Sequence, residues 1–498
     1  MKRSYLSVLA LILGILCLAG CAAQSAAVQP DPELPGTPHA VSGYIVVRGF
    51  EWGPGVNKVI LELDQAVDGV FPEGAKVTTS HYERTVLDAY LSDSMGYAVK
   101  GASQYIAFDL ETSFDCTGSP FEVDMDTELN NWADDYYVNL SVSVVRDNIR
   151  FPITLYADCI ENRICPELSR FTEPASFSGE YENPLTHELE TLTLTYAAYE
   201  PSNLASWEQN PLIIWLHGLG EGGTDIEKTI LGNEASALTE SEIQGHFISG
   251  EQTGAYVLIV QTPTYWLDSG DNTYGKGDMP SRYMEILMDT IQAYVAQNPD
   301  VDPDRIYIGG ASNGGFMTLE MCIHYPDYFA AAFPCCPAYA YYVYAKDLAG
   351  NYRTIFLKEY IRTRLVYFSE EKAELLTQTP IWFLQAIDDT IVPAFDYTLP
   401  VYRAILQAGA DNAWCSLYFG TRGTESADTQ YMAHWVWVYL LNDQVSRAQV
   451  PDSIRDSTEQ TFLSGYYPDR NGGPLAVTDG DGNAYDSIFA WMNDQVRD

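Results

Sequence analysis

The pentapeptide Gly310–Gly314, with the letters GASNG, places a serine in the pattern G-x-S-x-G. It follows a short run, Asp304–Ile308, that has the composition of a buried strand, and it precedes a segment whose apolar residues recur at helical spacing. At a sharp strand-to-helix turn the serine hydroxyl is exposed above a sheet, and the glycines leave room where side chains would clash. The pattern alone is common, but in this context it indicates that Ser312 is a nucleophile.

A serine nucleophile needs a general base, and His434 is the candidate. In the strand–turn–helix arrangement the order along the chain is serine, acid, histidine. The chain has seven histidines, and only His434 lies beyond the predicted strand that carries the candidate acids. We therefore expect the His434 imidazole to take the serine proton and later to give it to the leaving group.

The acid should follow the predicted strand Pro380–Leu384, where Asp388 and Asp389 are adjacent. Two neighbouring carboxylates on one turn cannot both face the same imidazole. The spacing D-x-x-V-P begins at Asp389, so we predict that Asp389 orients His434 and stabilises its charged form. Asp388 is the alternative, and its other role would be a hydrogen bond to loop backbone.

The negative oxygen that develops during acyl transfer needs two backbone N–H donors. One predicted donor is Asn313, the residue directly after the serine. The other should come from the loop after the predicted strand Leu212–Leu216, where His217–Gly220 reads H-G-x-G. Either Gly218 or Leu219 could donate, and the sequence does not choose between them.

These residues require a mostly parallel sheet with helices on both faces to position them. Short apolar strands alternate with helical segments over residues 176–498, which is typical of an α/β domain. The expected strands are Leu212–Leu216, Tyr256–Val260, Arg305–Ile308, Pro380–Leu384 and Trp414–Phe419, and the expected helices are Arg282–Gln297, Gly315–His324 and Tyr397–Ala408. In the loop after the second of these strands, Trp266 is predicted to bind substrate.

The preceding segment, residues 41–175, has a different pattern. Its apolar or alternating runs are separated by clusters of Gly, Pro, Asp and Asn, and no long helical period is present. The clearest expected strands are Tyr44–Arg48, Lys58–Leu63, Tyr105–Leu110 and Val138–Val144. This spacing predicts a separate all-β sandwich domain in front of the α/β domain.

Residues 1–20 have the layout of a secretory signal. Lys2 and Arg3 form a positive start, and Val8–Leu18 is almost unbroken apolar sequence. The apolar stretch is too short to serve well as a transmembrane helix. We therefore expect export from the cytoplasm.

The signal ends in Leu18–Cys21, with the letters LAGC, which resembles a bacterial lipobox. Cys21 would then become the lipidated first residue of the mature protein and hold it at the cell surface on the bacterial membrane. The alternative is ordinary signal cleavage near Ala19 or Ala23. Residues 21–40 are rich in Ala, Pro and Gln and are predicted to form a flexible tether.

The composition excludes several classes of partner. With 27 basic and 68 acidic residues the formal net charge is −41, which repels nucleic acid and anionic lipid headgroups. The nine cysteines are unevenly spaced and do not suggest a disulfide framework. Neither C-x-x-C nor H-E-x-x-H occurs, so we predict no metal and no cofactor.

The α/β half resembles the esterase branch of the α/β-hydrolases related to polyhydroxybutyrate depolymerases and feruloyl esterases. The motifs that carry the resemblance are H-G-x-G at 217–220, G-A-S-N-G-G at 310–315, D-T-I-V-P at 389–393, and His434 with its following tryptophans. Trp52–Leu61 resembles the opening of an immunoglobulin-like domain found in certain bacterial esterases. The resemblance implies an immunoglobulin-like sandwich at 41–175, an α/β-hydrolase fold at 176–498 and a Ser-His-Asp triad.

Two classes of function are open. The first is a serine carboxylesterase that acts through an acyl-enzyme on small-molecule or polysaccharide-linked esters, such as acetyl or feruloyl esters. A serine peptidase of the prolyl-oligopeptidase-like group is its alternative among enzymes, because the same triad cleaves amides. The second class is an inactive surface binding lipoprotein. A broken triad would mark it, whereas every required residue type is present here.

Overall fold

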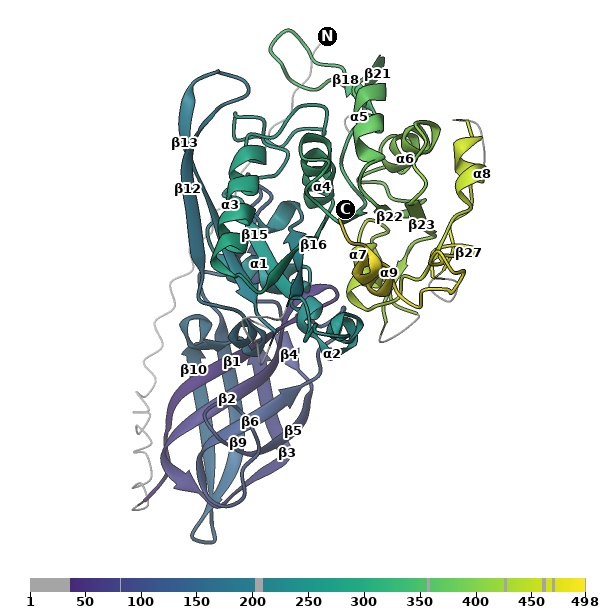
Figure 1. The fold of residues 1–498 in the computed structure, drawn as a ribbon. Helices are drawn as coiled ribbons and strands as arrows, with labels where there is room; N and C mark the ends of the chain where they lie inside the picture. The colour runs from purple at the N-terminus through teal and green to yellow at the C-terminus, as the bar shows by residue number, and fades with distance from the viewer. Residues whose placement is uncertain are drawn as a thin grey trace, which may run out of the picture.

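The computed structural model describes residues 36–80, 82–201, 209–355, 359–424, 428–458, 463–467 and 471–497. The predicted signal segment, Cys21 and most of the predicted tether lie outside these residues. A β-sandwich lies at one end of a larger α/β domain (Figure 1). Within the described part of the chain, no helix is long and apolar enough to cross a membrane.

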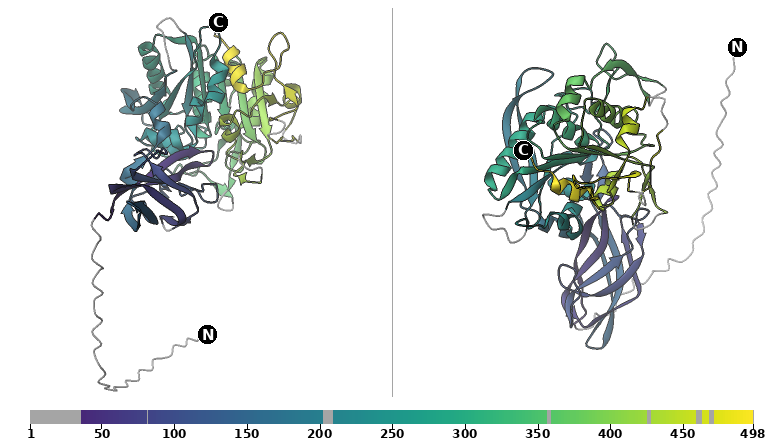
Figure 2. Two further views of the ribbon diagram at one scale, coloured as in Figure 1. Left: turned by 90° about the horizontal axis from the view of Figure 1, so that it is seen from below. Right: turned by 45° about the vertical axis from the view of Figure 1, so that its right-hand side comes forward.

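The N-terminal domain is a sandwich of two sheets (Figure 2). Its strands are β1 (Ala40–Phe50), β2 (Gly53–Val67), β3 (Gly69–Thr79), β4 (Tyr82–Arg84), β5 (Val86–Ser92), β6 (Ser103–Leu110), β9 (Tyr137–Arg146), β10 (Ile149–Asp158) and β11 (Arg163–Ile164). One sheet has the order β11-β1-β2-β6-β5 and the other β10-β9-β3-β4. In β9 every second residue from Val138 to Val144 is buried, because successive side chains of a strand point to opposite faces. The predicted all-β sandwich is confirmed.

The second domain is built on an eight-stranded sheet. Its strands are β12 (Ala175–Glu182), β13 (Leu189–Tyr199), β14 (Asn210–Leu216), β15 (Tyr256–Gln261), β16 (Val301–Ala311), β17 (Ala331–Cys335), β22 (Ile381–Ala386) and β23 (Ala413–Tyr418). The order is β12-β13-β15-β14-β16-β17-β22-β23, in which β12 and β13 are antiparallel additions to a parallel sheet. In β14, Leu212, Ile214 and Leu216 join one core and Ile213 and Trp215 the other, so both faces are covered. The predicted α/β fold is confirmed.

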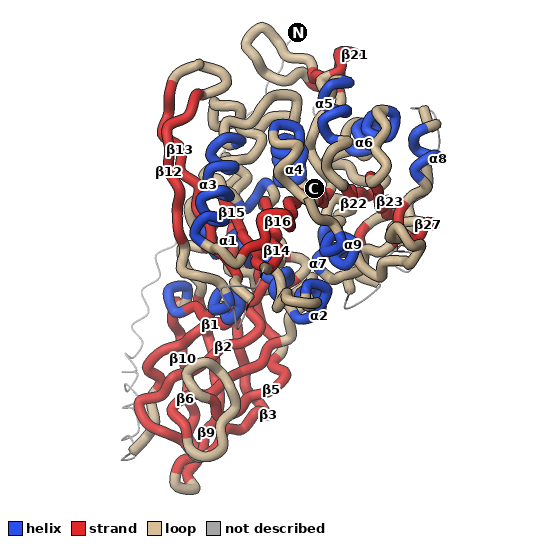
Figure 3. Tube along the Cα trace, in the orientation of Figure 1, coloured by secondary structure: helices blue, strands red, loops and turns tan. Residues whose placement is uncertain are grey.

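Helices cover the two faces of this sheet (Figure 3). One core includes residues of α3 (Met284–Gln297), α4 (Asn313–His324), α5 (Glu370–Leu376), α6 (Thr398–Gln407) and α8 (Pro451–Arg455). The other includes residues of α1 (Ile226–Gly232), α2 (Ser241–Gln244), α7 (Trp437–Leu441) and α9 (Ile488–Asp494). Short 3-10 turns are η1 (Ile160–Asn162), η2 (Pro166–Arg170), η3 (Leu219–Glu221), η4 (Ala235–Thr239) and η5 (Gly245–Phe247).

Five small two-stranded sheets lie in the loops of the described part of the chain. They pair β7 (Phe121–Val123) with β8 (Asn130–Trp132), β18 (Tyr342–Tyr344) with β21 (Arg362–Val366), β19 (Thr354–Ile355) with β20 (Glu359–Tyr360), β24 (Thr421–Arg422) with β25 (Gln430–Tyr431), and β26 (Arg447–Ala448) with β27 (Leu475–Ala476). The sequence did not predict these pairs. They rest on two to five residues each, too short for a periodic signal.

The turn between β1 and β2 joins the two domains. It carries Glu51, whose buried carboxylate accepts hydrogen bonds from the Thr424 N–H at 3.0 Å, the Thr424 hydroxyl at 2.6 Å and the Tyr431 hydroxyl at 2.5 Å. Satisfying a buried carboxylate in this way offsets the cost of removing it from water. Because Tyr431 is three residues before His434, the sandwich directly contacts the loop that carries this histidine.

Candidate active site

Ser312 lies in the sharp turn between β16 and α4, as the sequence predicted. Its φ of 58° and ψ of −109° fall in a sparsely populated region, which is the kind of strain that persists at functional sites. The Ser312 N–H donates to the Cys335 carbonyl at 2.9 Å, and its own carbonyl accepts from the N–H groups of Phe316 and Ala338, both at 3.0 Å. These three backbone bonds hold the serine in its strained conformation.

The two glycines of the motif allow the turn to pass close to β14. A Cβ on Gly310 would lie 2.3 Å from the carbonyl oxygen of Leu216, and a Cβ on Gly314 would lie 2.0 Å from the same atom. No real Cβ tolerates such a contact with backbone. The glycines therefore let α4 start directly above the end of the sheet.

His434 and Asp389 form a buried pair. The Nδ1 of His434 lies 2.7 Å from Oδ2 of Asp389. The carboxylate is fixed by three further donors: its Oδ1 accepts from the N–H groups of Ile391 at 2.8 Å and Val392 at 2.9 Å, and its Oδ2 accepts from Gln385 Nε2 at 3.1 Å. Such a pair holds the imidazole in one tautomer, with a proton on Nδ1 and Nε2 free to accept another.

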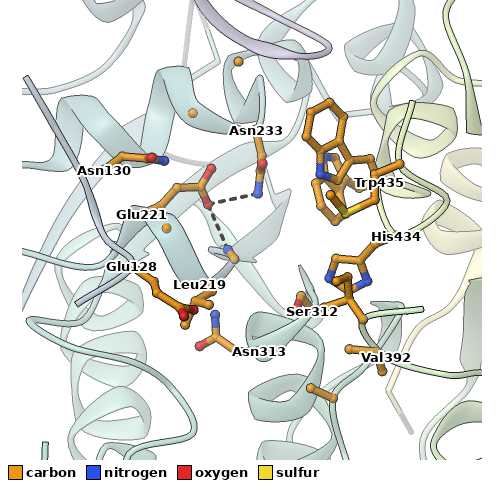
Figure 4. Close-up of a pocket in the computed structure, with 18 of the residues that line it drawn as sticks. Glu128, Asn130, Leu219, Glu221, Asn233, Ser312, Asn313, Val392, His434 and Trp435 are labelled. Carbon is orange, nitrogen blue, oxygen red and sulfur yellow. Dashed lines mark hydrogen bonds between the residues drawn. The ribbon is translucent and has the colours of Figure 1, made fainter. Parts of the chain in front are cut away.

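The structure brings Ser312, His434 and Asp389 together although they are far apart in the sequence. Figure 4 shows the Ser312 side chain beside the His434 imidazole. Asp388, the alternative acid, is exposed, and its Oδ1 accepts from the Gly420 N–H at 2.7 Å. Asp389 is thus the aspartate placed against the histidine.

Cys336 is a neighbour of this pair, and the sequence did not predict a functional role for it. Its Sγ donates to the His434 carbonyl at 3.3 Å, and burial raises the pKa of the Cys336 thiol to about 11. Burial disfavours a charged His434, whereas Cys336 and Asp389 favour it, and the balance raises the pKa of His434. Because Cys336 is a neutral thiol at neutral pH, the Asp389 carboxylate is the charge that stabilises the imidazolium.

The same three side chains carry atoms of the kinds that bind metal ions. The ligand atoms of Cys336, Asp389 and His434 lie within 4.8 Å of one another. However, Asp389 and His434 are already hydrogen-bonded to each other. A metal would have to break that bond, so the geometry suits proton transfer better than coordination.

The structure distinguishes the two candidate donors in the H-G-x-G loop. The Gly218 N–H donates to Glu221 Oε2 at 2.8 Å and is therefore occupied. The Leu219 N–H has no hydrogen-bond partner among the residues that the structure describes. Asn313 opens α4, where backbone N–H groups lack helical partners, and Figure 4 shows Leu219 next to Asn313. We therefore infer that Leu219 and Asn313 form the oxyanion hole.

His217 is structural, in agreement with its place before the serine. It is fully buried, and burial lowers its pKa to about 4, so it is neutral. Its Nδ1 donates to the Gly218 carbonyl at 2.6 Å, and its Nε2 accepts from the Thr262 N–H at 3.2 Å. The ring therefore fixes the backbone of the oxyanion loop.

The prediction that Trp266 binds substrate is wrong. Its side chain is fully buried in the core, with ring centroids of His217 at 5.3 Å and Tyr283 at 6.2 Å, and it does not line the pocket. An aromatic loop residue packs inward when a neighbouring layer can cover it. The contribution of Trp266 is its backbone N–H, which donates to Asn313 Oδ1 at 2.8 Å and orients that side chain.

Glu221 is a buried acid that positions the oxyanion loop. Its Oε2 accepts from the Gly218 N–H and, at 3.0 Å, from Asn233 Nδ2 (Figure 4). Burial raises the pKa of Glu221 to about 8, and the Gly218 N–H opposes this shift. The carboxyl group is therefore largely neutral at neutral pH while still accepting both hydrogen bonds.

We expect Glu221→Ala to lower kcat by roughly 10- to 100-fold with little change in KM, because the freed Gly218 N–H no longer orients the adjacent Leu219 donor. Glu221→Gln should retain most activity, since its amide oxygen can accept the same bond. Equal losses in both variants would contradict the positioning role. A second measurement is the urea concentration at the midpoint of unfolding. Wild type should lose stability as the pH rises from the ordinary carboxyl range through about 8, because the fold disfavours the charged form of Glu221. Glu221→Gln should lack this dependence of stability on pH.

Ser312 and His434 line a pocket of about 540 Å³. Its lining includes side chains from both domains. The sandwich contributes Glu51, Trp52, Ser119, Phe121, Val123, Glu128 and Asn130, and the α/β domain contributes Leu219, Leu267, Lys276, Val392, Met432, Trp435 and others. The β7–β8 pair is attached to the α/β domain at this wall, because Lys228 Nζ of α1 donates to the Asn130 carbonyl at 2.8 Å. The sandwich is therefore one wall of the pocket.

The comparisons with known proteins agree with this architecture. The family model for the esterase Ig-like N-terminal domain matches residues 42–148, and the prolyl oligopeptidase family model matches residues 266–413. Poly(3-hydroxyalkanoate) depolymerase C of Paucimonas lemoignei is 41% identical over 69 residues, which are 14% of this chain and 15% of the depolymerase. The crystal structure of a thermostable esterase matches with a TM-score of 0.57 and 21% identity, over 81% of this chain and 96% of that one.

The likeness to the thermostable esterase shows the fold, and the two family models assign the two domains. The resemblance to esterases with an immunoglobulin-like N-terminus is thereby confirmed. The chain has an α/β-hydrolase fold, preceded by an esterase-type immunoglobulin-like domain.

Proposed function

We propose that this protein is a secreted, lipid-anchored carboxylesterase. The observation that supports the esterase activity is the His434–Asp389 pair beside Ser312, with two backbone N–H donors in the same pocket. Ser312 Oγ attacks the ester carbonyl carbon while His434 Nε2 takes its proton, and Leu219 and Asn313 stabilise the oxyanion. His434 then protonates the leaving alcohol, and water hydrolyses the acyl-enzyme by the same steps.

The pocket favours esters over peptides. Its volume of about 540 Å³ and its aromatic lining suit a small acyl or aromatic group. One end is bounded by the sandwich, through Trp52 and Phe121, which limits the room for a long chain. Carbohydrate-linked acetyl and feruloyl esters are the natural substrates that we propose. Peptide hydrolysis is the second candidate, because residues 266–413 match the prolyl oligopeptidase family.

The test is to assay the purified protein on acetyl, butyryl and feruloyl esters beside a peptide amide. We expect kcat/KM for the best ester to exceed that for the amide by at least about 100-fold. A faster amide reaction would make the protein a peptidase. If none of the compounds is hydrolysed, the result would favour a binding protein whose triad is inactive.

The lipid anchor is a separate proposal that rests on Cys21 in the LAGC sequence. In a bacterial host, we expect metabolic labelling with palmitate and recovery in the membrane fraction, both lost in Cys21→Ser. Cys17→Ser is the matched control, because Cys17 lies in the apolar stretch of the same signal. Unchanged labelling of Cys21→Ser would contradict the anchor.

A further inference from the structure

A second cavity adjoins the catalytic pocket. Its volume is about 530 Å³, close to that of the catalytic pocket. The two cavities share the wall formed by Leu267 and Tyr274–Lys276. Beyond this wall the second cavity is lined by Lys346, Tyr352 and Tyr360 among others. A substrate with its ester at Ser312 could therefore extend into this space. The mechanism described above makes no use of it.

Two lysines line this cavity in a chain whose net charge is −41. Lys276 Nζ lies 3.6 Å from the ring centroid of Tyr360 and 4.8 Å from that of Tyr274, and Lys346 Nζ lies 4.5 Å from that of Tyr352. Neither ammonium group has a carboxylate within 4.0 Å among the side chains that the structure describes. The aromatic rings hold both cations without neutralising them.

Lys276 is held in a fixed relation to the nucleophile. The backbone N–H of Lys276 donates to the Tyr352 hydroxyl at 3.3 Å. The next residue, Gly277, has a φ of +75°, and its carbonyl accepts from the Ala340 N–H at 3.0 Å. Ala338, two residues before Ala340, donates its N–H to the Ser312 carbonyl. A short path of backbone hydrogen bonds thus connects the elbow to the segment that carries Lys276.

Among the described residues, one acidic side chain also lines the cavity. Asp271 is exposed, and its Oδ1 accepts from the Thr273 N–H at 3.0 Å and from the Thr273 hydroxyl at 2.6 Å. These bonds direct Asp271 into its own turn. The cavity lining, in the residues that the structure describes, therefore holds two cations and one anion, against an acidic background that repels negative ligands elsewhere on the surface.

We propose that this cavity is a subsite for a carboxylate-bearing ring of the substrate, which lies against the tyrosines while Lys276 and Lys346 bind its carboxylate. This inference rests on the proposed esterase function and narrows it to esters whose alcohol or acyl part carries a carboxylate. Charge-assisted contacts to lysine supply the affinity, and the flat tyrosine faces accept a sugar or aromatic ring.

The experiment compares matched pairs of charged and neutral esters. meta-Carboxyphenyl acetate and meta-carbamoylphenyl acetate test the alcohol side, and ethyl para-carboxycinnamate and its carbamoyl analogue test the acyl side. In at least one pair, wild type should prefer the carboxylate, and Lys276→Gln should lower that preference in kcat/KM about tenfold. Lys346→Gln should act in the same direction, and Lys276→Arg should retain the preference.

The control is Lys100→Gln, which removes the same charge from an exposed site in the sandwich, away from both cavities. It should leave the preference at the wild-type value. An equal change in Lys100→Gln and Lys276→Gln would mean that net charge, and not this subsite, sets the preference. An unchanged preference in Lys276→Gln for both pairs would overturn the proposal.

Binding to a Ser312→Ala background separates this inference from the esterase proposal. By calorimetry, meta-hydroxybenzoate should bind about tenfold more weakly when Lys276→Gln is added, whereas meta-hydroxybenzamide should not distinguish the two proteins. If wild type hydrolyses no ester but this difference is found, the subsite stands and the esterase proposal falls. If esters are hydrolysed, and both this difference and the kinetic preference in the two ester pairs are absent, the subsite falls alone.

Discussion

Replacing Ser312 by alanine is expected to lower kcat for ester hydrolysis by a factor on the order of 10⁶. Without Oγ no acyl-enzyme forms, and only the residual effect of Leu219 and Asn313 on a direct attack by water remains. Substrate binding should change little, because the pocket walls are intact. The variant should also fold normally: alanine keeps the Cβ, and the turn is held by backbone bonds to Cys335, Phe316 and Ala338.

The measurement is steady-state hydrolysis of short p-nitrophenyl esters together with a thermal melt. Ser176→Ala is the matched control, since Ser176 is exposed on the edge strand β12 and does not line the pocket. Labelling with an organophosphonate should modify the peptide that contains Ser312 in wild type and not in the variant. Substantial turnover by a well-folded Ser312→Ala protein would reject the nucleophile assignment.

The fold was predictable because its signals are local. Strands such as Leu212–Leu216 are continuous apolar runs, and a strand that is buried on both faces must be of that kind. The two-stranded sheets β18–β21 and β19–β20, which lie between β17 and β23 along the chain, were not predictable. Their stability comes from the loops around them and not from a periodic sequence of their own. Glu51 illustrates the same limit. Its role depends on Thr424 and Tyr431, more than 370 residues further along the chain.

The triad was predictable to the extent that chain order and spacing determine it. The G-x-S-x-G turn is a local structure, and the requirement for a histidine after the acid left one candidate. The choice between Gly218 and Leu219 was not predictable, because it depends on the Glu221 carboxylate that occupies one N–H. Trp266 was misassigned for a related reason: a loop position reveals nothing about which layer covers the side chain.

Replacing Asp389 by asparagine is expected to lower kcat on the order of 10⁴-fold. The direction follows from the hydrogen bonds around the carboxylate. Its Oδ1 accepts from the N–H groups of Ile391 and Val392, so the oxygen of an asparagine would remain there and its NH₂ would face His434. An NH₂ donor at Nδ1 moves the imidazole proton to Nε2. That nitrogen could then no longer take the proton of Ser312.

Asp388→Asn is the matched control for this prediction, because it is the neighbouring carboxylate and its Oδ1 contacts only the Gly420 N–H among the described hydrogen bonds. It should change kcat by no more than a few-fold. Equal losses in the two variants would contradict the assignment of Asp389.

The pH profile gives an independent test of the same pair. The Asp389 charge raises the pKa of His434 against the opposing effect of burial, and the acid limb of kcat/KM reports the ionisation of this base in the free enzyme. Removing the charge disfavours the imidazolium, so the acid limb of Asp389→Asn should move to lower pH while the plateau falls. An acid limb that stays in place would mean that Asp389 acts through geometry alone. A shift to higher pH would mean that another group, and not His434, accepts the proton from Ser312.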